Sequence, residues 1–332
     1  MSWQIRPICK DDLEQAVALA QLTGPGFTNI PSSRDAYAER IAWSEASFAR
    51  TGEAPANDLY LMVLEDTRNG ALGGTVLLFG QVGTEWPFYS YLVSEHAQHS
   101  RMLGRTIRAE LLHLVTDNGG ASEVGGLFLH PELRRDRLGR FIARSRYLFI
   151  AQHRARFGPR FVSELRGWLT PEGQSPFWDA IGRHFFDMDF IEADRFNASH
   201  GNQFIAELMP KYPIYSAMLP AEARAVIGRP HDSGLPAMRL LEAEGFHFEG
   251  YVDIFDGGPT MNVRTDQIRT VRDSRVGPYL GRTDEGAGLI CAAGKLTGFR
   301  AWRDVGLHDG EGWRLVDGGG LARGEEVRCV AL

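Results

Sequence analysis

The sequence predicts a mixed α/β (α+β) fold in which helices flank a largely antiparallel sheet. Strand-like apolar runs and helical repeats follow the order β, α, α, β, β, β, β, α, β, α, β, unlike the strict alternation of a doubly wound parallel sheet. Asn69-Gly70 lies between two apolar runs and indicates an antiparallel hairpin. Beyond about residue 270 the chain is rich in glycine and lacks long helical periodicity, which predicts a small C-terminal β appendage.

The first part of the chain supplies most of the expected strands. Strands are expected at residues 3–8, 59–65, 72–79, 87–93 and 123–129, and a helix is expected at residues 32–50. Another helix should follow Asp11, which can cap it because Glu14 comes three residues later. The segment TGPGFTNIPSS, residues 23–33, is expected to be a loop because of its glycine, proline and serine content.

The later part alternates helices and strands. A helix is expected from Leu138 to Phe157, because apolar side chains recur on one face and Gly158 follows as a stop signal. Further expected elements are a strand at 160–167, a helix at 175–186, a helix ending at Gly245 and a strand through Tyr251 to Phe255.

The composition is that of an ordinary soluble globular protein. The chain has 332 residues, of which 43% are hydrophobic and 23% charged, so it can form one large or two modest domains. A net charge of −6 argues against general affinity for nucleic acid. No apolar run approaches the roughly 18 residues needed to span a bilayer, so no membrane partner is expected.

The cysteines and the N-terminus indicate a cytoplasmic location. Cys9, Cys291 and Cys329 lie far apart and are odd in number, which fits a reducing compartment and gives neither a disulfide framework nor a zinc pattern. No metal site is expected. The opening residues MSWQIRPICKDD contain no apolar signal region.

The stretch LFLHPELRRDRLGRFIARSRYLF, residues 127–149, joins an expected strand to an expected helix through an arginine-rich loop. Loop amides, the positive end of a helix dipole and guanidinium groups at one point favour a polyanion such as a phosphate. The loop resembles the Arg/Gln-x-x-Gly-x-Gly/Ala motif with which GNAT acyl-CoA N-acyltransferases hold the CoA pyrophosphate. Arg134 takes the first motif position and Gly139 the last, whereas Arg137 replaces the first glycine.

A closer resemblance covers nearly the whole chain. The matching blocks are IRPI, LFLHPELR, ARSRYLFIAQHRARF, SELRG, SPFWDAIGRHFFDMDF, AELMPKYPIY, GRPHDSGLPAMRLLEAEGF and YVDIFDGGPT. They resemble the arginine N-succinyltransferase family. The resemblance implies a GNAT-like acyltransferase region at residues 1–270, with an inserted segment at about 166–233, followed by a small β-rich region at 271–332.

The family resemblance also implies a reaction. Its members transfer the succinyl group of succinyl-CoA to the α-amine of L-arginine, the first step of the succinyltransferase route of arginine catabolism. Succinyl-CoA is then a co-substrate, and no cofactor is expected. Some members also act on ornithine and pair as two related subunits, which implies a homo- or hetero-oligomer.

Carried over residue by residue, the family's succinyl-CoA contact falls on Leu127 and its proton donor on His231. Backbone N–H groups of the strand through Leu127 and Leu129 could polarise the thioester carbonyl. His231 stands between prolines and glycines, on a constrained loop. His184, His200 and His247 remain rival histidines.

A cationic, carboxylate-bearing acceptor needs further groups. Carboxylates can hold a guanidinium, and Asp253 and Asp256 beside the Gly-Gly-Pro turn are the first candidates, with Glu164 another. Arg166 and Ser175 could bind the succinyl carboxylate, but nothing in the spacing selects them.

Two alternatives stay open. The chain could prefer ornithine, or it could be a non-catalytic partner subunit; the intact His231 loop disfavours the second idea, whereas Arg137 keeps it open. A pyridine-nucleotide enzyme is disfavoured because no G-x-G-x-x-G motif follows an early strand.

Overall fold

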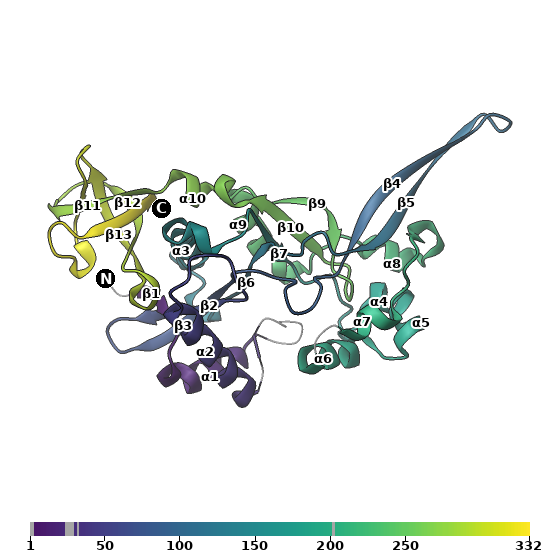
Figure 1. Cartoon of the computed structure of the whole chain (residues 1–332), viewed down its shortest axis with the longest axis horizontal. Helices are drawn as coiled ribbons and strands as arrows, with labels where there is room; N and C mark the ends of the chain where they lie inside the picture. The colour runs from purple at the N-terminus through teal and green to yellow at the C-terminus, as the bar shows by residue number, and fades with distance from the viewer. Residues whose placement is uncertain (1–2, 24–29, 32, 201–202) are drawn as a thin grey trace.

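The computed structural model describes residues 3–23, 30–31, 33–200 and 203–332 (Figure 1). Most of the loop expected at residues 23–33 lies outside these described residues. The molecule is elongated, with the C-terminal strands at one end, a long sheet in the middle, and a group of short helices beside a projecting hairpin at the other end.

The strands form one continuous sheet. They are β1 (Trp3–Pro7), β2 (Leu59–Asp66), β3 (Ala71–Phe79), β4 (Ser90–Ser100), β5 (Arg105–Val115), β6 (Ser122–Leu129), β7 (Arg160–Glu164), β8 (Ile214–Tyr215), β9 (His247–Val252), β10 (Pro259–Arg264), β11 (Arg275–Arg282), β12 (Ala287–Ala293), β13 (Arg300–His308), β14 (Trp313–Leu315) and β15 (Glu326–Ala331). Their spatial order is β12-β15-β11-β14-β13-β1-β2-β3-β6-β7-β10-β9-β4-β5-β8. Over the described residues, the β6–β7 and β11–β14 pairings are parallel and the other strand pairings are antiparallel, which confirms the predicted fold class.

Helices cover both faces of the sheet. They are α1 (Leu13–Ala20), α2 (Arg34–Ala49), α3 (Leu138–Gln152), α4 (Pro176–Ala180), α5 (Arg183–Phe186), α6 (Phe190–His200), α7 (Gln203–Leu208), α8 (Ala221–Val226), α9 (Leu235–Ala243) and α10 (Arg269–Asp273). In β2, Tyr60 and Met62 join the core beneath α3, whereas Leu61 and Val63 join the core beneath α1 and α2. Because successive strand residues point to opposite faces, α3 lies on the face opposite α1 and α2.

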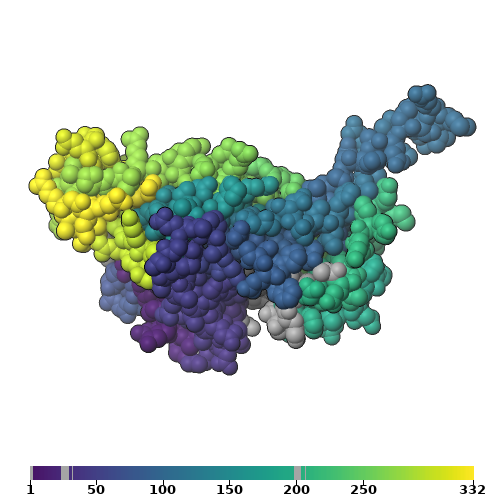
Figure 2. Space-filling model, in the orientation of Figure 1, coloured from purple at the N-terminus to yellow at the C-terminus, as the bar shows by residue number. Residues whose placement is uncertain are grey.

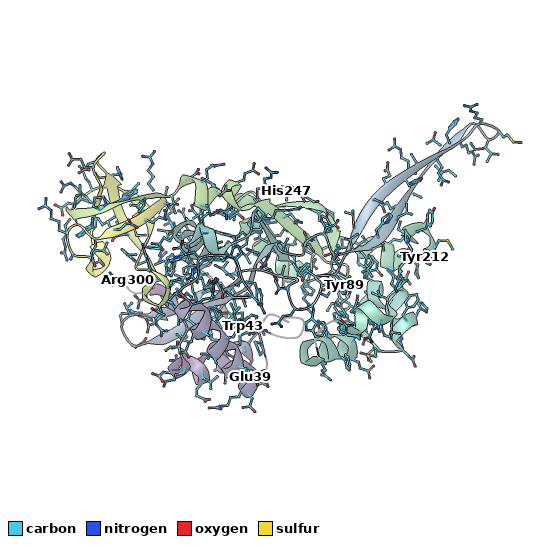
Figure 3. The ribbon with its side chains drawn as sticks, viewed as in Figure 1. Glu39, Trp43, Tyr89, Tyr212, His247 and Arg300 are labelled. Carbon is cyan, nitrogen blue, oxygen red and sulfur yellow. The ribbon has the colours of Figure 1, made fainter. Side chains whose placement is uncertain are left out.

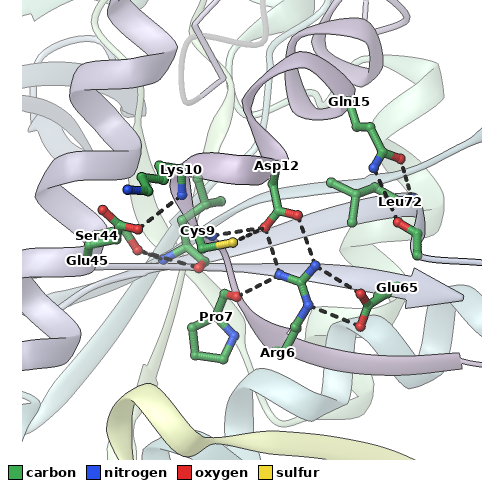
Figure 4. A network of polar contacts seen from close by, with 12 residues as sticks. Arg6, Pro7, Cys9, Lys10, Asp12, Gln15, Ser44, Glu45, Glu65 and Leu72 are labelled. Carbon is green, nitrogen blue, oxygen red and sulfur yellow. Dashed lines mark hydrogen bonds and ion pairs between the residues drawn. The ribbon is translucent and has the colours of Figure 1, made fainter. Parts of the chain in front are cut away.

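The expectation that Asp11 caps the first helix is wrong. The carboxylate that bonds the backbone before this helix is that of Asp12. It accepts a hydrogen bond from the Cys9 N–H at 2.9 Å and pairs with Arg6 at 2.7 Å (Figure 4). Arg6 also reaches Glu65 on β2 at 3.1 Å. The half-buried Arg6 guanidinium thus ties β1 to its neighbour strand, and its ion pair with Asp12 fixes where the Asp12 carboxylate points.

Two predicted helices differ in length. The helix expected to reach Phe157 ends at Gln152, and a 3₁₀ turn at Arg154–Arg156 continues the chain. The helix expected at 175–186 is broken into α4 and α5, because the ring of Trp178 packs directly on Gly182, where a Cβ would approach Trp178 Cε3 to 2.3 Å.

Strands β4 and β5 form a long arm that the sequence did not reveal. All eleven residues of β4 pair with β5, but β4 pairs with β9 only at Tyr91 and Leu92. The rest of the ribbon projects from the body (Figure 2). At its tip, Met102 is 99% exposed and Leu103 70% exposed. The arm therefore carries apolar side chains into solvent far from the core.

The C-terminal strands β11 to β15 pair in a closed ring, because β12 contacts both β13 and β15. This ring joins the main sheet through β13 and β1. The segment 166–233 contains α4 to α8, and residue 270 falls within α10. Over the described residues, no helix combines the length and apolar character required to traverse a bilayer.

Candidate active site

A cavity of about 920 Å³ lies where β6, β7, α3, α6 and α9 meet. Most of the predicted site residues line it together: Leu127, Leu129, Arg134, Gly139, Glu164, Arg166, Asp253 and Asp256. Leu129 belongs to the core beneath α3, whereas its neighbour Phe128 belongs to the core beneath α1 and α2. Both residues line the cavity, so the cavity is reached from both faces of the sheet.

The cavity opens because β6 and β7 separate. Their parallel pairing is recorded at Ser122–Phe161 and Glu123–Val162, near the start of both strands. On its other side, β6 has a bulge against β3 at Gly126, which adopts a left-handed φ of +53°. A Cβ at Gly126 would lie 2.6 Å from Leu77 Cδ2, so this position requires glycine.

The backbone of β6 turns an amide group toward this gap. The His130 N–H donates to the Gly73 carbonyl of the β3 side at 2.8 Å. Since neighbouring N–H groups of a strand point to opposite sides, the Leu129 N–H faces away from β3, toward the side where β7 has separated. Leu127 lies within the bulge, where this alternation does not apply.

The arginine-rich loop ends in a strained entry to α3. Asp136 and Arg137 both have left-handed φ angles, of 54° and 57°, and Arg137 is the residue directly before the helix. Glycine adopts this conformation more easily, which explains why the related motif has glycine at this position. Arg134 points back to the strand and donates to the Leu129 carbonyl at 3.2 Å. From the C-terminal ring, Arg303 donates to the Asp136 carbonyl at 2.7 Å.

Carboxyl groups gather on the other side of the gap. Phe161 packs beneath α3, so strand alternation places Glu164 on the opposite face. Burial raises the pKa of Glu164 well above its usual value, and the charges of Asp253, Glu123 and Asp256 add to this effect. Holding three or more negative charges so close together is costly, so the cluster favours the binding of a cation.

The two predicted aspartates differ in their bonding. Asp256 accepts N–H donors with both oxygens, from Gly167 at 2.6 Å and Gly258 at 2.8 Å, so it holds two backbone segments together. Asp253 uses Oδ1 to accept from the Phe255 and Asp256 N–H groups at 2.7 and 2.9 Å. Burial raises the pKa of both carboxyls. Asp253 is thus better placed than Asp256 to offer an oxygen to a ligand.

The polar groups of the cavity that the sequence did not select include Arg146 of α3, and Asp194 and Asn197 of α6. Arg146 is only 3% exposed, because α3 packs on the sheet. A charged residue among apolar neighbours in this helix was the signal that could have identified it. Asp194 and Asn197 carry no such signal, because the sequence does not show that α6 folds back over the gap.

His231 is not among the residues that line the cavity, but it contacts Ser233, which does line it. Its Nδ1 accepts from the Ser233 N–H at 3.2 Å and lies 2.7 Å from the Ser233 hydroxyl. The backbone contact assigns the proton of the neutral ring to Nε2. Burial, followed by the charge of Arg166, lowers the pKa of His231, so the neutral ring predominates near pH 7.

The rival residues lie elsewhere. His247 is exposed on β9 and pairs with Glu249 at 2.9 Å (Figure 3). His184 is exposed on α5 and is absent from the cavity lining, and the side chain of His200 lies outside the described part of the structure. Ser175 caps α4 by accepting from the Trp178 N–H at 3.1 Å.

A family model described as "Arginine N-succinyltransferase beta subunit" matches residues 3–270. The chain belongs to this family. The curated arginine N-succinyltransferase subunit beta of Pseudomonas aeruginosa is 42% identical over 272 residues, covering 82% of this chain and 79% of the relative. The arginine N-succinyltransferase of Yersinia enterocolitica is 41% identical over 271 residues, covering 82% of this chain and 78% of the relative.

The likeness to one solved structure extends past residue 270. The arginine/ornithine succinyltransferase subunit AI of Pseudomonas aeruginosa superposes with a TM-score of 0.89 at 32% identity and covers 99% of this chain and 98% of its own. The C-terminal ring of strands is therefore shared with this arginine N-succinyltransferase relative, although the family model ends at residue 270.

Proposed function

We propose that this chain is an arginine N-succinyltransferase, which transfers the succinyl group of succinyl-CoA to the α-amine of L-arginine and releases CoA and N2-succinyl-L-arginine. The observation that supports this most is the gap between β6 and β7, which joins a cationic loop on one face of the sheet to a carboxyl cluster on the other. A polyanionic acyl donor and a cationic acceptor can then meet at one point.

The donor side suits succinyl-CoA. The loop from Arg134 to Gly139 and the first turn of α3 offer guanidinium groups, backbone N–H groups and the positive end of a helix dipole to the pyrophosphate. The thioester then lies in the gap, where the Leu127 and Leu129 N–H groups can donate to its carbonyl oxygen. These contacts strengthen as the oxygen gains negative charge in the transition state.

The acceptor side suits a guanidinium and a neutral amine. Glu164 and Asp253 supply carboxylate oxygens for the guanidinium, with Asp256 supporting them from the turn. In the reaction the amine nitrogen forms a bond to the carbonyl carbon and the carbon–sulfur bond breaks. In its protonated form, His231 gives its Nε2 proton to the departing sulfur and becomes neutral, and the neutral ring then takes the proton that the nitrogen loses, so the charges balance.

The function is tested with the purified chain, succinyl-CoA and a panel of amines. Free thiol release is followed, and the product mass is measured. We expect L-arginine with succinyl-CoA to give a far higher kcat/KM than lysine as acceptor or acetyl-CoA as donor. Equal turnover with acetyl-CoA would contradict the acyl assignment, and a clear preference for ornithine would contradict the amine assignment.

Ornithine remains the second candidate acceptor, because the solved relative is described as an arginine/ornithine succinyltransferase subunit. We further propose that the chain works as an oligomer, with itself or with a related subunit. The exposed apolar tip of the arm supports this, as does the word "subunit" in the description of its relatives. A cytoplasmic site of action is consistent with the free thiols of Cys9, Cys291 and Cys329.

A further inference from the structure

Arg166 has an unsatisfied hydrogen-bond donor in the candidate active site. Its side chain lines the cavity directly after β7, and its Nε is buried without a hydrogen-bond partner among the residues described. Buried polar atoms in proteins are almost always paired, so an unpaired donor that faces a cavity indicates a missing acceptor. A guanidinium binds a carboxylate best, through two parallel N–H donors.

The surroundings of Arg166 are those of a zwitterion site. Asp256 and Asp194 are close enough to favour its charge, while burial lowers its pKa. Asn197, also on α6, has a buried amide oxygen without a partner and lines the same cavity. An α-amino acid carries a carboxylate and an ammonium on one carbon, and it therefore needs a cation and an acceptor side by side.

The position of Arg166 relative to the sheet indicates which of two incoming carboxylates it can bind, that of the succinyl group or that of the amino acid. Arg146, the other cavity arginine with a buried unpaired Nε, is on α3, the helix at whose N-terminus the donor loop lies. Arg166 instead lies with Asp194 and Asp256, in the acidic cluster to which Glu164 and Asp253 also belong. A carboxylate held by Arg166 therefore belongs to the molecule that enters from the acceptor side.

Resting on the proposed function, we propose that Arg166 binds the α-carboxylate of the amino-acid acceptor and so restricts the enzyme to α-amino acids. Its backbone supports the same role. The Arg166 carbonyl accepts a hydrogen bond from the His231 N–H at 2.8 Å, so the group that anchors the carboxylate and the group that moves the proton are held in fixed register.

The test compares acceptors that differ only by this carboxylate: L-arginine with agmatine, and L-ornithine with putrescine. Arg166→Ala should lower kcat/KM for L-arginine by about ten- to a hundredfold, mainly through KM, because a charge-assisted hydrogen bond contributes about 1.5–3 kcal/mol. The slower agmatine reaction should hardly change. Arg166→Lys should recover part of the loss. Arg160→Ala is the matched control, since Arg160 begins the strand that Arg166 follows but pairs with Glu249 at the surface.

Different outcomes overturn different claims. Equal losses for arginine and agmatine would give Arg166 a structural role, and a raised KM for succinyl-CoA would assign it to the acyl carboxylate; either result overturns the inference. Calorimetric binding of the four amines to each variant, with CoA present, gives a readout that does not need turnover. Suppose that the wild type binds arginine more tightly than agmatine, that Arg166→Ala does not, and that neither amine is acylated. The proposed function then fails and the inference stands.

Discussion

At the residue scale, several side chains hold conformations or charges that a folded protein normally avoids, and they cluster at the cavity. Arg137 is left-handed, Glu164 is a buried carboxyl among other carboxyls, and Arg166 has an unpaired buried donor. Such features persist only where the rest of the fold holds them in place, and they concentrate at functional sites. Each of them gives an expectation that can be measured.

Replacing Arg137 by glycine should stabilise the chain. A left-handed non-glycine residue costs about 1–2 kcal/mol relative to glycine, partly offset by the greater freedom of glycine in the unfolded chain. We expect the free energy of unfolding to rise by about 0.5–1 kcal/mol, measured by urea denaturation. Asp136→Gly is a useful comparison, because Asp136 also has a left-handed φ, of 54°; no gain in either variant would show that left-handed strain is not the cause.

Replacing Glu164 by glutamine should change the pH dependence of stability. The pKa of Glu164 is raised in the folded state, so the folded chain holds its proton more tightly than the unfolded chain. Its stabilising effect is present below the unfolded value of about 4.3 and is lost as pH rises toward the folded value, at about 1.4 kcal/mol per unit of difference. Wild type should therefore lose more stability than Glu164→Gln between pH 5 and pH 8. Parallel stability curves for the two proteins would contradict this.

Replacing His231 by asparagine should lower kcat by about 10²–10⁴-fold and leave KM for both substrates nearly unchanged. Only the protonated ring can give a proton to the sulfur, and its pKa is lowered by burial and by Arg166. Wild-type kcat should therefore fall as pH rises, beginning below the ordinary histidine range, and this alkaline limb should vanish in the variant. His247→Asn serves as the control. Near-wild-type kcat in His231→Asn would make the residue structural.

At the element scale, the signals that the sequence carried were local ones. The strand–loop–helix unit from β6 to α3 was predicted because its apolar run, arginine loop and helix repeat are contiguous. The β2–β3 hairpin followed from Asn69-Gly70, and Gly70 indeed has a φ of +72°. The arm escaped because β4 beyond Val93 is a run of polar and small residues, SEHAQHS, with no apolar alternation.

Of the residues that line the cavity, the sequence indicated those of the arginine-rich loop but only some of those on the carboxyl side. The donor loop is one continuous segment, so a motif could reveal it. The acceptor half combines the ends of β7 and β9 with α6, and no local pattern reports that Asp194 comes near Asp253. Nor could spacing distinguish Asp256, which bonds the backbone, from Asp253, which has an oxygen to offer. Contacts between distant segments decide these roles.

At the scale of the whole molecule, the arm is the feature that a lone chain explains least. A two-stranded ribbon is only marginally stable in water without cover. Tyr212 is 87% exposed near the base of the arm, so exposed apolar side chains lie at both ends of the arm (Figure 3). An assembly that covers this surface would stabilise both parts.

Replacing Leu103 by aspartate should therefore lower the mass of the particle in solution, measured by light scattering after gel filtration. Helix α3 and the cavity are distant from the tip, so the fold of each chain should persist by circular dichroism. Gly104→Asp is unsuitable as a control because Gly104 has a φ of +58°. Thr106→Asp, which adds the same charge on β5 without removing an apolar side chain, is the better one. An unchanged mass in Leu103→Asp would show that the tip is not an interface.

The opening between β6 and β7 can be reached from both faces of the sheet. In the proposed reaction, succinyl-CoA arrives at the face that carries α3, and the amino acid arrives at the face that carries the carboxyl cluster. Neither substrate has to wait for the other to leave, so both occupy the protein together and no acyl group needs to rest on a side chain. Initial rates should consequently give intersecting rather than parallel double-reciprocal lines, and free CoA should compete with succinyl-CoA but not with the amino acid.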